Sequence, residues 1–271
     1  MAALRHGVVS LLLATITAGL TCQKDVAAER AFDVKEALKQ FKDAVNDRKA
    51  TKDQEAIGII DSFLMEKGYA TFAKKEQSDV RKALSSALTS TRVRREPEQK
   101  GVFVAATVAL GTMGKDGAKE LVKAYKATKF KKKEWVSMRA VILKQVGKTK
   151  DVTQSKFLLD EATRAPEDPI MVAAGEALGG YQGEPQKIRK DLAKKLIVKY
   201  GQVYGNAHAN LDPADPVRQR FMQTLAAIAS PWNTTLGRLT SQDYRTAPEW
   251  QKYWNKNKSK NWDKDRPKVS R

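Results

Sequence analysis

The segment VFVAATVALGTMG at residues 102–114 is an alanine-rich apolar run that closes on Ala109, Leu110 and Gly111. Its composition and length predict a helix. Comparable runs recur downstream, and recurrence of one helical pattern at a near-constant spacing is typical of a repeat array. Arrays of this kind bind partners along their surfaces, so the segment directs attention to interaction surfaces.

The recurrence is clearest at the leucine near the end of each apolar run. Leu110, Leu143 and Leu178 are separated by 33 and 35 residues, and Leu225 follows after 47. Eight residues before these leucines, on the same side of a 3.6-residue helix, lie Val102, Trp135, Ile170 and Val217. Small residues follow each leucine, and we expect them to let neighbouring helices approach closely. The glycines among them, which we expect to end the helices in a left-handed conformation, are Gly111, Gly114, Gly147, Gly179 and Gly180.

A second, amphipathic helix is expected after each of the first three apolar helices. In the first repeat, apolar side chains fall at i, i+3, i+4 and i+7: Ala118, Leu121, Val122 and Tyr125. The corresponding stripes further on are Phe157, Leu158 and Ala162, and then Ile188, Leu192 and Leu196. An apolar helix followed by an amphipathic one predicts a helical hairpin.

Over residues 104–125, 136–162 and 171–196, and less closely over 217–229, the chain resembles the HEAT family of helical-hairpin repeats, including its short bacterial variety. This resemblance covers roughly half of the chain. It implies an all-α fold, an α-solenoid with a right-handed superhelix and a binding surface along one face, and it transfers no catalytic residue. An irregular helical bundle is the alternative.

Five parts of the chain follow from this interpretation: a signal peptide (1–23), an N-terminal helical region (24–97), HEAT-like repeats (98–230), a Trp-rich C-terminal cap (231–257) and a basic tail (258–271). The N-terminal region contains three apolar stripes, around Phe41, Ile60 and Leu84, which predict three helices. The polar residues 91–100 are a candidate hinge. Residues 201–216, rich in Gly, Asn and Pro, predict an inserted irregular loop.

Four of the five tryptophans lie in the last forty residues. A helix beginning near Thr246, with Pro248 in its first turn, places Trp250 and Trp254 on one face. They either seal the apolar end of the last repeat or contact a ligand by stacking. The segment from Leu236 to Thr240, read as a turn before this helix, resembles the tail of exported bacterial proteins of this repeat type, with Ser241 where glycine is expected.

The N-terminus has the composition of a signal peptide. Arg5 precedes an almost uncharged run at residues 7–20, which is shorter than the roughly 20 apolar residues of a membrane span. We therefore expect cleavage and export, with an uncleaved amphipathic anchor as the alternative. Cys22, the only cysteine, excludes an intramolecular disulfide. Its position permits lipid anchoring as a minority alternative, because residues 19–21 fit the lipoprotein pattern poorly.

The chain is strongly basic, with 50 Lys and Arg against 31 Asp and Glu and a net charge of +19. This charge favours encounter with polyanions in general. The candidate partner-binding lysines form stripes beside the apolar faces of two predicted helices: Lys115, Lys119, Lys123 and Lys126, and then Lys187, Lys190 and Lys194. Lys156 is followed by Asp160 and Glu161, which interrupts the series. An ordinary solvated face is the alternative reading.

The sequence contains no recognisable catalytic or metal-binding set. It has two histidines, His6 and His208, and its glycines do not form a phosphate loop. His208 with Asp212 and Asp215 is a weak metal pattern, and His208 with Asp212 would be needed by a cryptic hydrolase or lyase. Asn233 begins a short glycosylation sequon that arises easily by chance.

The sequence therefore predicts a non-enzymatic, exported repeat scaffold that needs no cofactor. Its expected partner is a protein or an anionic envelope polymer, bound through basic helical faces. The alternative is an α-solenoid that binds nucleic acid, which export disfavours.

Overall fold

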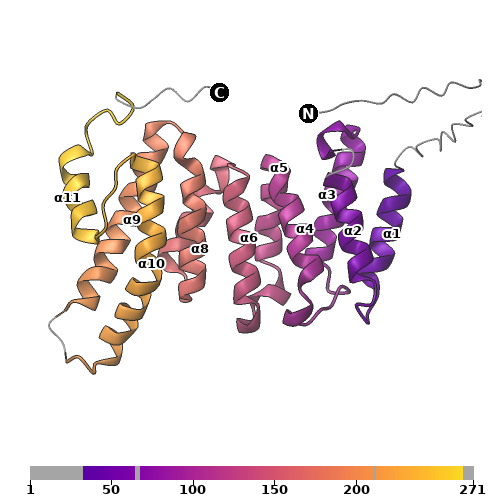
Figure 1. Cartoon of the computed structure of the whole chain (residues 1–271), viewed down its shortest axis with the longest axis horizontal. Helices are drawn as coiled ribbons and strands as arrows, with labels where there is room; N and C mark the ends of the chain where they lie inside the picture. Colours follow the sequence, from indigo (N-terminus) through magenta and orange to yellow (C-terminus); the bar gives the residue numbers. More distant parts are fainter. Residues whose placement is uncertain (1–32, 65–67, 210–211, 265–271) are drawn as a thin grey trace, which may run out of the picture. The chain divides into compact units, whose positions relative to one another are not determined.

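The computed structural model describes residues 33–64, 68–209 and 212–264, and within these ranges it contains eleven α-helices and no strand (Figure 1). The predicted all-α class is confirmed. Residues Asp33–Arg271 form one compact unit. The predicted signal peptide, with Cys22, lies outside the described residues.

The N-terminal region contains the three expected helices: α1 (Val34–Asn46), α2 (Asp53–Leu64) and α3 (Lys74–Thr89). Asp33 caps α1 by accepting a hydrogen bond from the backbone N–H of Lys35 at 2.8 Å. Phe41, Ile60 and Leu84 are buried, so each apolar stripe faces the core.

The six helices predicted for the three hairpins are present in the predicted order. They are α4 (Gly101–Thr112) with α5 (Gly114–Tyr125), α6 (Val136–Lys148) with α7 (Ser155–Arg164), and α8 (Asp168–Leu178) with α9 (Gln186–Ala207). The chain continues through α10 (Pro216–Thr240) and α11 (Ala247–Asn257).

These helices contact one another in two rows. The first row is α2, α4, α6, α8 and α10, in which each helix contacts the next. The second row is α1, α3, α5, α7, α9 and α11. In it α1, α3 and α5 are in contact in order, and so are α7, α9 and α11. Tyr125 of α5 meets Phe157 of α7 with ring centres 5.3 Å apart, which connects the two parts of the second row. The apolar faces of the two rows are buried against each other.

The segment at residues 102–114 forms α4 and the start of α5. Helix α4 contacts α2, α3, α5 and α6, which explains why it is apolar on all sides instead of amphipathic. Val102, Phe103, Ala106 and Leu110 are completely buried.

Most of the glycines that follow Leu110, Leu143 and Leu178 do not adopt the predicted left-handed conformation. Gly114 alone among them is left-handed, with φ 58°. Gly111 and Gly147 lie inside α4 and α6, and Gly179 and Gly180 form a short 3₁₀ turn. A Cβ added to Gly147 would lie 2.6 Å from the carbonyl oxygen of Ala177 on α8. The left-handed cap is therefore wrong for these four glycines; Gly147 lets two backbones approach closely.

Three further predictions near the C-terminus are wrong in whole or in part. Residues 201–207, expected to begin an irregular loop, continue α9, because Tyr200, Val203 and Ala207 are buried by packing. The side chain at Val217 is 60% exposed, so it does not correspond to buried Val102, Trp135 and Ile170. The predicted turn from Leu236 to Thr240 is the last part of α10.

Residues 91–100, the candidate hinge, are fixed to their neighbours. Arg95 is buried, and its guanidinium donates to both carboxylate oxygens of Asp53 at the start of α2, at 2.6 to 3.0 Å. It also donates to the carbonyl oxygen of Val45 at the end of α1, at 3.2 Å. The segment thus connects α3 to two earlier helices.

Candidate functional site

The positive charge is concentrated in the second row of helices. Those six helices contain 20 Lys and Arg against 10 Asp and Glu, whereas the five helices of the first row contain 6 against 5. The second row therefore presents the surface at which an anion is attracted.

Acidic side chains of the second row close the junctions around α5. Asp116 of α5 pairs with Arg81 of α3 at 3.0 Å, and Glu120 of α5 accepts a hydrogen bond from Ser85. Between α5 and α7, the Tyr125 hydroxyl donates to Glu161 at 2.6 Å. Burial and this hydrogen bond raise the pKa of Tyr125. The Glu161 carboxylate therefore points toward α5, and its hydrogen-bond partner belongs to the second row.

Helices α7 and α9 are in contact, and their shared surface is hollowed. A groove of about 590 Å³ lies there, lined by cationic, polar and apolar side chains: Lys156, Leu159, Asp160, Thr163 and Arg164 of α7, and Lys194, Lys195, Val198, Lys199 and Gln202 of α9. Five cations thus surround one carboxylate. Leu159 and Val198 are the apolar residues of the lining; Leu159 is buried and Val198 is 44% exposed.

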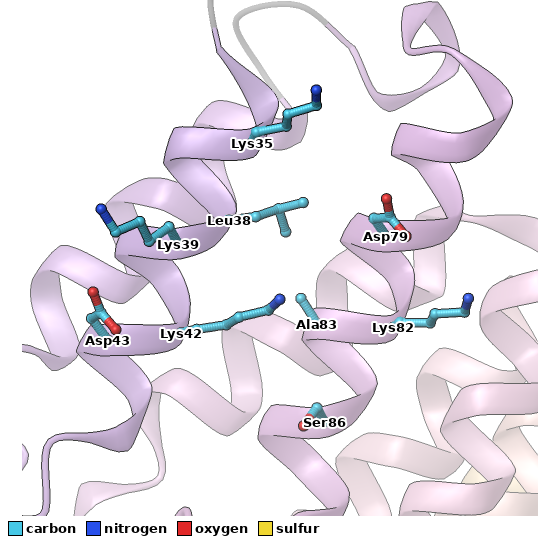
Figure 2. Close-up of a pocket in the computed structure, with 9 residues that line it drawn as sticks. All are labelled: Lys35, Leu38, Lys39, Lys42, Asp43, Asp79, Lys82, Ala83 and Ser86. Atoms are coloured by element: carbon cyan, nitrogen blue, oxygen red, sulfur yellow. The ribbon is translucent and has the colours of Figure 1, made fainter.

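A second groove, of about 700 Å³, lies between α1 and α3 (Figure 2). Leu38 and Lys42 extend from α1 toward Ala83 of α3 (Figure 2). Lys39 and Lys82 point away from the space between the two helices. Asp79 lies on the α3 side, so this groove presents less positive charge than the one between α7 and α9.

The four predicted lysines of α5 and its end, Lys115, Lys119, Lys123 and Lys126, are all exposed. Burial raises the pKa of Asp151, but hydrogen bonds from Thr153 and Gln154 outweigh it and lower the pKa, and the charge of Lys115 adds a smaller effect in the same direction. Lys126 lies 5.7 Å from the ring centre of Phe157 on α7. The structure brings none of the four into the groove between α7 and α9.

The three predicted lysines of α9 have different surroundings. Lys187 is exposed. Lys190 donates to the carbonyl oxygen of Lys260 at 2.5 Å and lies 5.4 Å from the ring centre of Trp262. Its ammonium group is therefore in contact with the C-terminal segment. Lys194 alone lines the groove.

Sequence reasoning missed four cations of the groove: Lys156, Arg164, Lys195 and Lys199. Asp160 and Glu161 follow Lys156 and interrupt the lysine series in the sequence, but in the structure Glu161 accepts a hydrogen bond from Tyr125. A helical wheel of α7 separates Lys156 from Glu161, and that signal was present in the sequence.

The C-terminal aromatic residues mostly face the protein. Helix α11 begins after Thr246 as predicted, with a capping box formed by Thr246 and Glu249. Trp250 is completely buried and donates to the Asn233 side chain at 2.8 Å. Trp254 is half-buried and meets Trp262 with ring centres 6.1 Å apart. Asn233, the predicted sequon residue, also donates to the carbonyl oxygen of Arg245 at 2.7 Å, so its amide is engaged.

His208 is exposed at the end of α9, stacked on Tyr204, with Nδ1 2.9 Å from the Tyr204 carbonyl oxygen. Among the described residues, no group of three His, Cys, Asp or Glu side chains is placed to bind a metal ion. In the same part of the chain, no helix has both the length and the apolar character that crossing a bilayer requires.

Lys129 is the described lysine whose pKa is clearly shifted. Burial, helped by the charge of Arg95, lowers its pKa to about 8. Its ammonium donates to the carbonyl oxygen of Val93 at 3.0 Å and lies 4.8 Å from the ring centre of Phe103. Through these contacts Lys129 holds the segment that follows α3, so its role is structural.

Comparison with family models, curated proteins and solved structures gave no match to the chain.

Proposed function

We propose that the protein is a non-enzymatic, exported scaffold that binds an anionic partner, a protein or an envelope polymer, through the second row of its helices. The observation that carries the proposal is the concentration of lysine on that row, with an open basic groove between α7 and α9. Exposed cations at this density raise the encounter rate with an anion and contribute salt-sensitive affinity.

The proposal includes an α-solenoid of HEAT-like hairpins. It is supported by the order of contacts, since each helix of the first row contacts its predecessor and successor in that row. A stack of hairpins leaves one row of helices along one side, and such a side offers an extended binding surface. On five of the six helices of that row, lysines outnumber Asp and Glu. A partner that contacts the whole row would require such a distribution.

Export is the part of the proposal that rests on residues 1–23 alone. Their basic start and short apolar run favour a cleaved signal peptide. Fractionation of cells that produce the tagged chain, with mass spectrometry of its N-terminus, tests this part. Retention in the cytoplasm would overturn export and would favour a nucleic-acid partner.

Binding is tested with two anionic probes, a labelled poly-glutamate peptide and heparin, at several salt concentrations. We expect affinity to fall at least about tenfold between 50 and 300 mM NaCl, because exposed charges are screened. A second-row variant, Lys119→Glu with Lys194→Glu, should bind at least about fivefold more weakly.

The matched control reverses two exposed cations of the first row, Lys148→Glu and Arg238→Glu, which changes the net charge equally. Its affinity should fall by less than about twofold. Equal losses in both variants would show that net charge alone acts. Absence of salt-sensitive binding to either probe would overturn the proposed function.

A further inference from the structure

We infer that the groove between α7 and α9 binds an acidic segment of a partner protein, with an apolar side chain of that segment seated on Val198 and Leu159. This inference rests on the proposed function and adds the site and the chemical class of the partner.

The first argument is the state of the groove's cations. Within the described residues, Lys156, Lys194 and Lys199 have no carboxylate at ion-pair distance. Lys195 pairs with Asp191 at 2.9 Å, and Arg164 approaches Asp160 only at 3.9 Å. Three ammonium groups are thus available to a partner without loss of an existing ion pair.

The second argument is the contrast with the neighbouring junctions. At α3–α5 and α5–α7 the chain supplies its own acids, Asp116, Glu120 and Glu161, which contact residues of the adjacent helix. At α7–α9 the groove has only Asp160, which lies beside Arg164 on its own helix. An acidic partner would supply there what the chain supplies at the other two junctions.

The third argument is the exposed apolar side chain in the groove lining, which selects the class of partner. Val198 is 44% exposed and lines the same groove as buried Leu159 and the five cations. The sugar and polyol units of sulfated and phosphorylated polymers carry oxygen on most of their carbons, whereas a peptide with Leu or Val among its acids has a fully apolar side chain to cover Val198. Covering apolar surface adds affinity that salt does not screen.

The fourth argument is size. A volume of about 590 Å³ accommodates a few side chains of a segment rather than a folded domain. The groove between α1 and α3 has similar volume, but Asp79 lies on one of its walls and two of its lysines point away. Charge complementarity therefore favours the groove between α7 and α9.

The test measures the affinity of the purified chain for a labelled 12-residue peptide that repeats Glu-Glu-Leu-Glu, and for the same peptide with Ser in place of Leu. Lys194→Glu with Lys199→Glu should weaken binding of the leucine peptide at least about tenfold. Val198→Ser should weaken the leucine peptide about threefold and leave the serine peptide unchanged, because only the former covers the apolar side chain of Val198.

The control reverses two lysines of α5, Lys119→Glu with Lys123→Glu, at equal cost in net charge. Its effect on the leucine peptide should be less than about threefold. Equal losses from the α5 and α9 pairs would overturn the groove while leaving the proposed function intact. Tighter binding of heparin than of the leucine peptide, lost with the α9 pair, would overturn the peptide class. If neither peptide nor heparin binds in a salt-sensitive manner, both proposals fail.

Discussion

Gly147 and Gly180 have no side chain to contribute, yet they decide how closely α6 approaches its neighbours. A Cβ at Gly147 would lie 2.6 Å from the Ala177 carbonyl oxygen, and one at Gly180 would lie 2.6 Å from the Gly147 carbonyl oxygen. In each case the opposing atom belongs to backbone, which moves only if a helix moves. These glycines therefore set the interhelical distance in the first row.

Gly147→Ala should lower the free energy of unfolding by about 2 to 3 kcal/mol, because the methyl group overlaps the backbone of α8. The matched control is Gly58→Ala in α2, where nothing lies within 4 Å of the added Cβ. The control should raise stability by about 0.5 to 1 kcal/mol through helix propensity. Urea unfolding followed by circular dichroism measures both, and a Gly147→Ala variant as stable as Gly58→Ala would contradict the packing argument.

The sequence predicts that small residues let neighbouring helices approach closely, as Gly147 does, but it also predicts left-handed helix ends that these two glycines do not form. Their spacing after each leucine was visible, whereas the close contact with another helix depends on residues 30 or more positions away. Ser241 is a different case, because there the left-handed conformation is found. Glycine was expected there, and the serine adopts the left-handed conformation with φ 60° that explains why glycine suits this position.

Among the helices and their connections, residues 91–100 show how a polar sequence can be structural. Arg95 is buried beside Asp53, and no pattern in the sequence pairs two residues so far apart. Polar composition alone suggested an open hinge, because a buried ion pair and an exposed charge look alike in sequence. Helix starts were predicted better, since capping depends on near neighbours, as Thr246 and Glu249 show.

Arg95→Met should destabilise the protein by about 3 kcal/mol, because it leaves Asp53 without its buried partner. Asp53→Asn should have a similar effect for the converse reason. The double variant should cost less than the sum of the two, by about 1 to 3 kcal/mol, as expected for residues in direct contact. Urea unfolding of the four proteins completes the cycle, and additive effects would show that the two side chains act independently.

For the whole molecule, the all-α class and the order of the helices were predictable, while the candidate site was not. Periodicity within each helix shows which face is apolar, as for Leu121 in α5. The groove depends on which side chains of α7 and α9 meet, and Lys156 and Lys199 belong to different helices. Only Lys194 was identified in advance, because it belonged to a lysine stripe within one helix.

Because each helix contacts mainly its neighbours in the chain, we expect damage to one helix interface to stay local. Helix α1 contacts α2 and α3, and α2 contacts α1 and α4. Neither has a comparable contact with α8, which lies several helices further along the chain. Hydrogen exchange of Gly147→Ala should therefore show at least about tenfold faster exchange in α6 and α8, with α1 and α2 within about twofold of the unmodified chain. Gly58→Ala serves as the control and should accelerate neither region. An equal loss of protection in all helices would show a single cooperative unit, and it would argue against the proposed solenoid, because nearest-neighbour coupling is what a stack of hairpins requires.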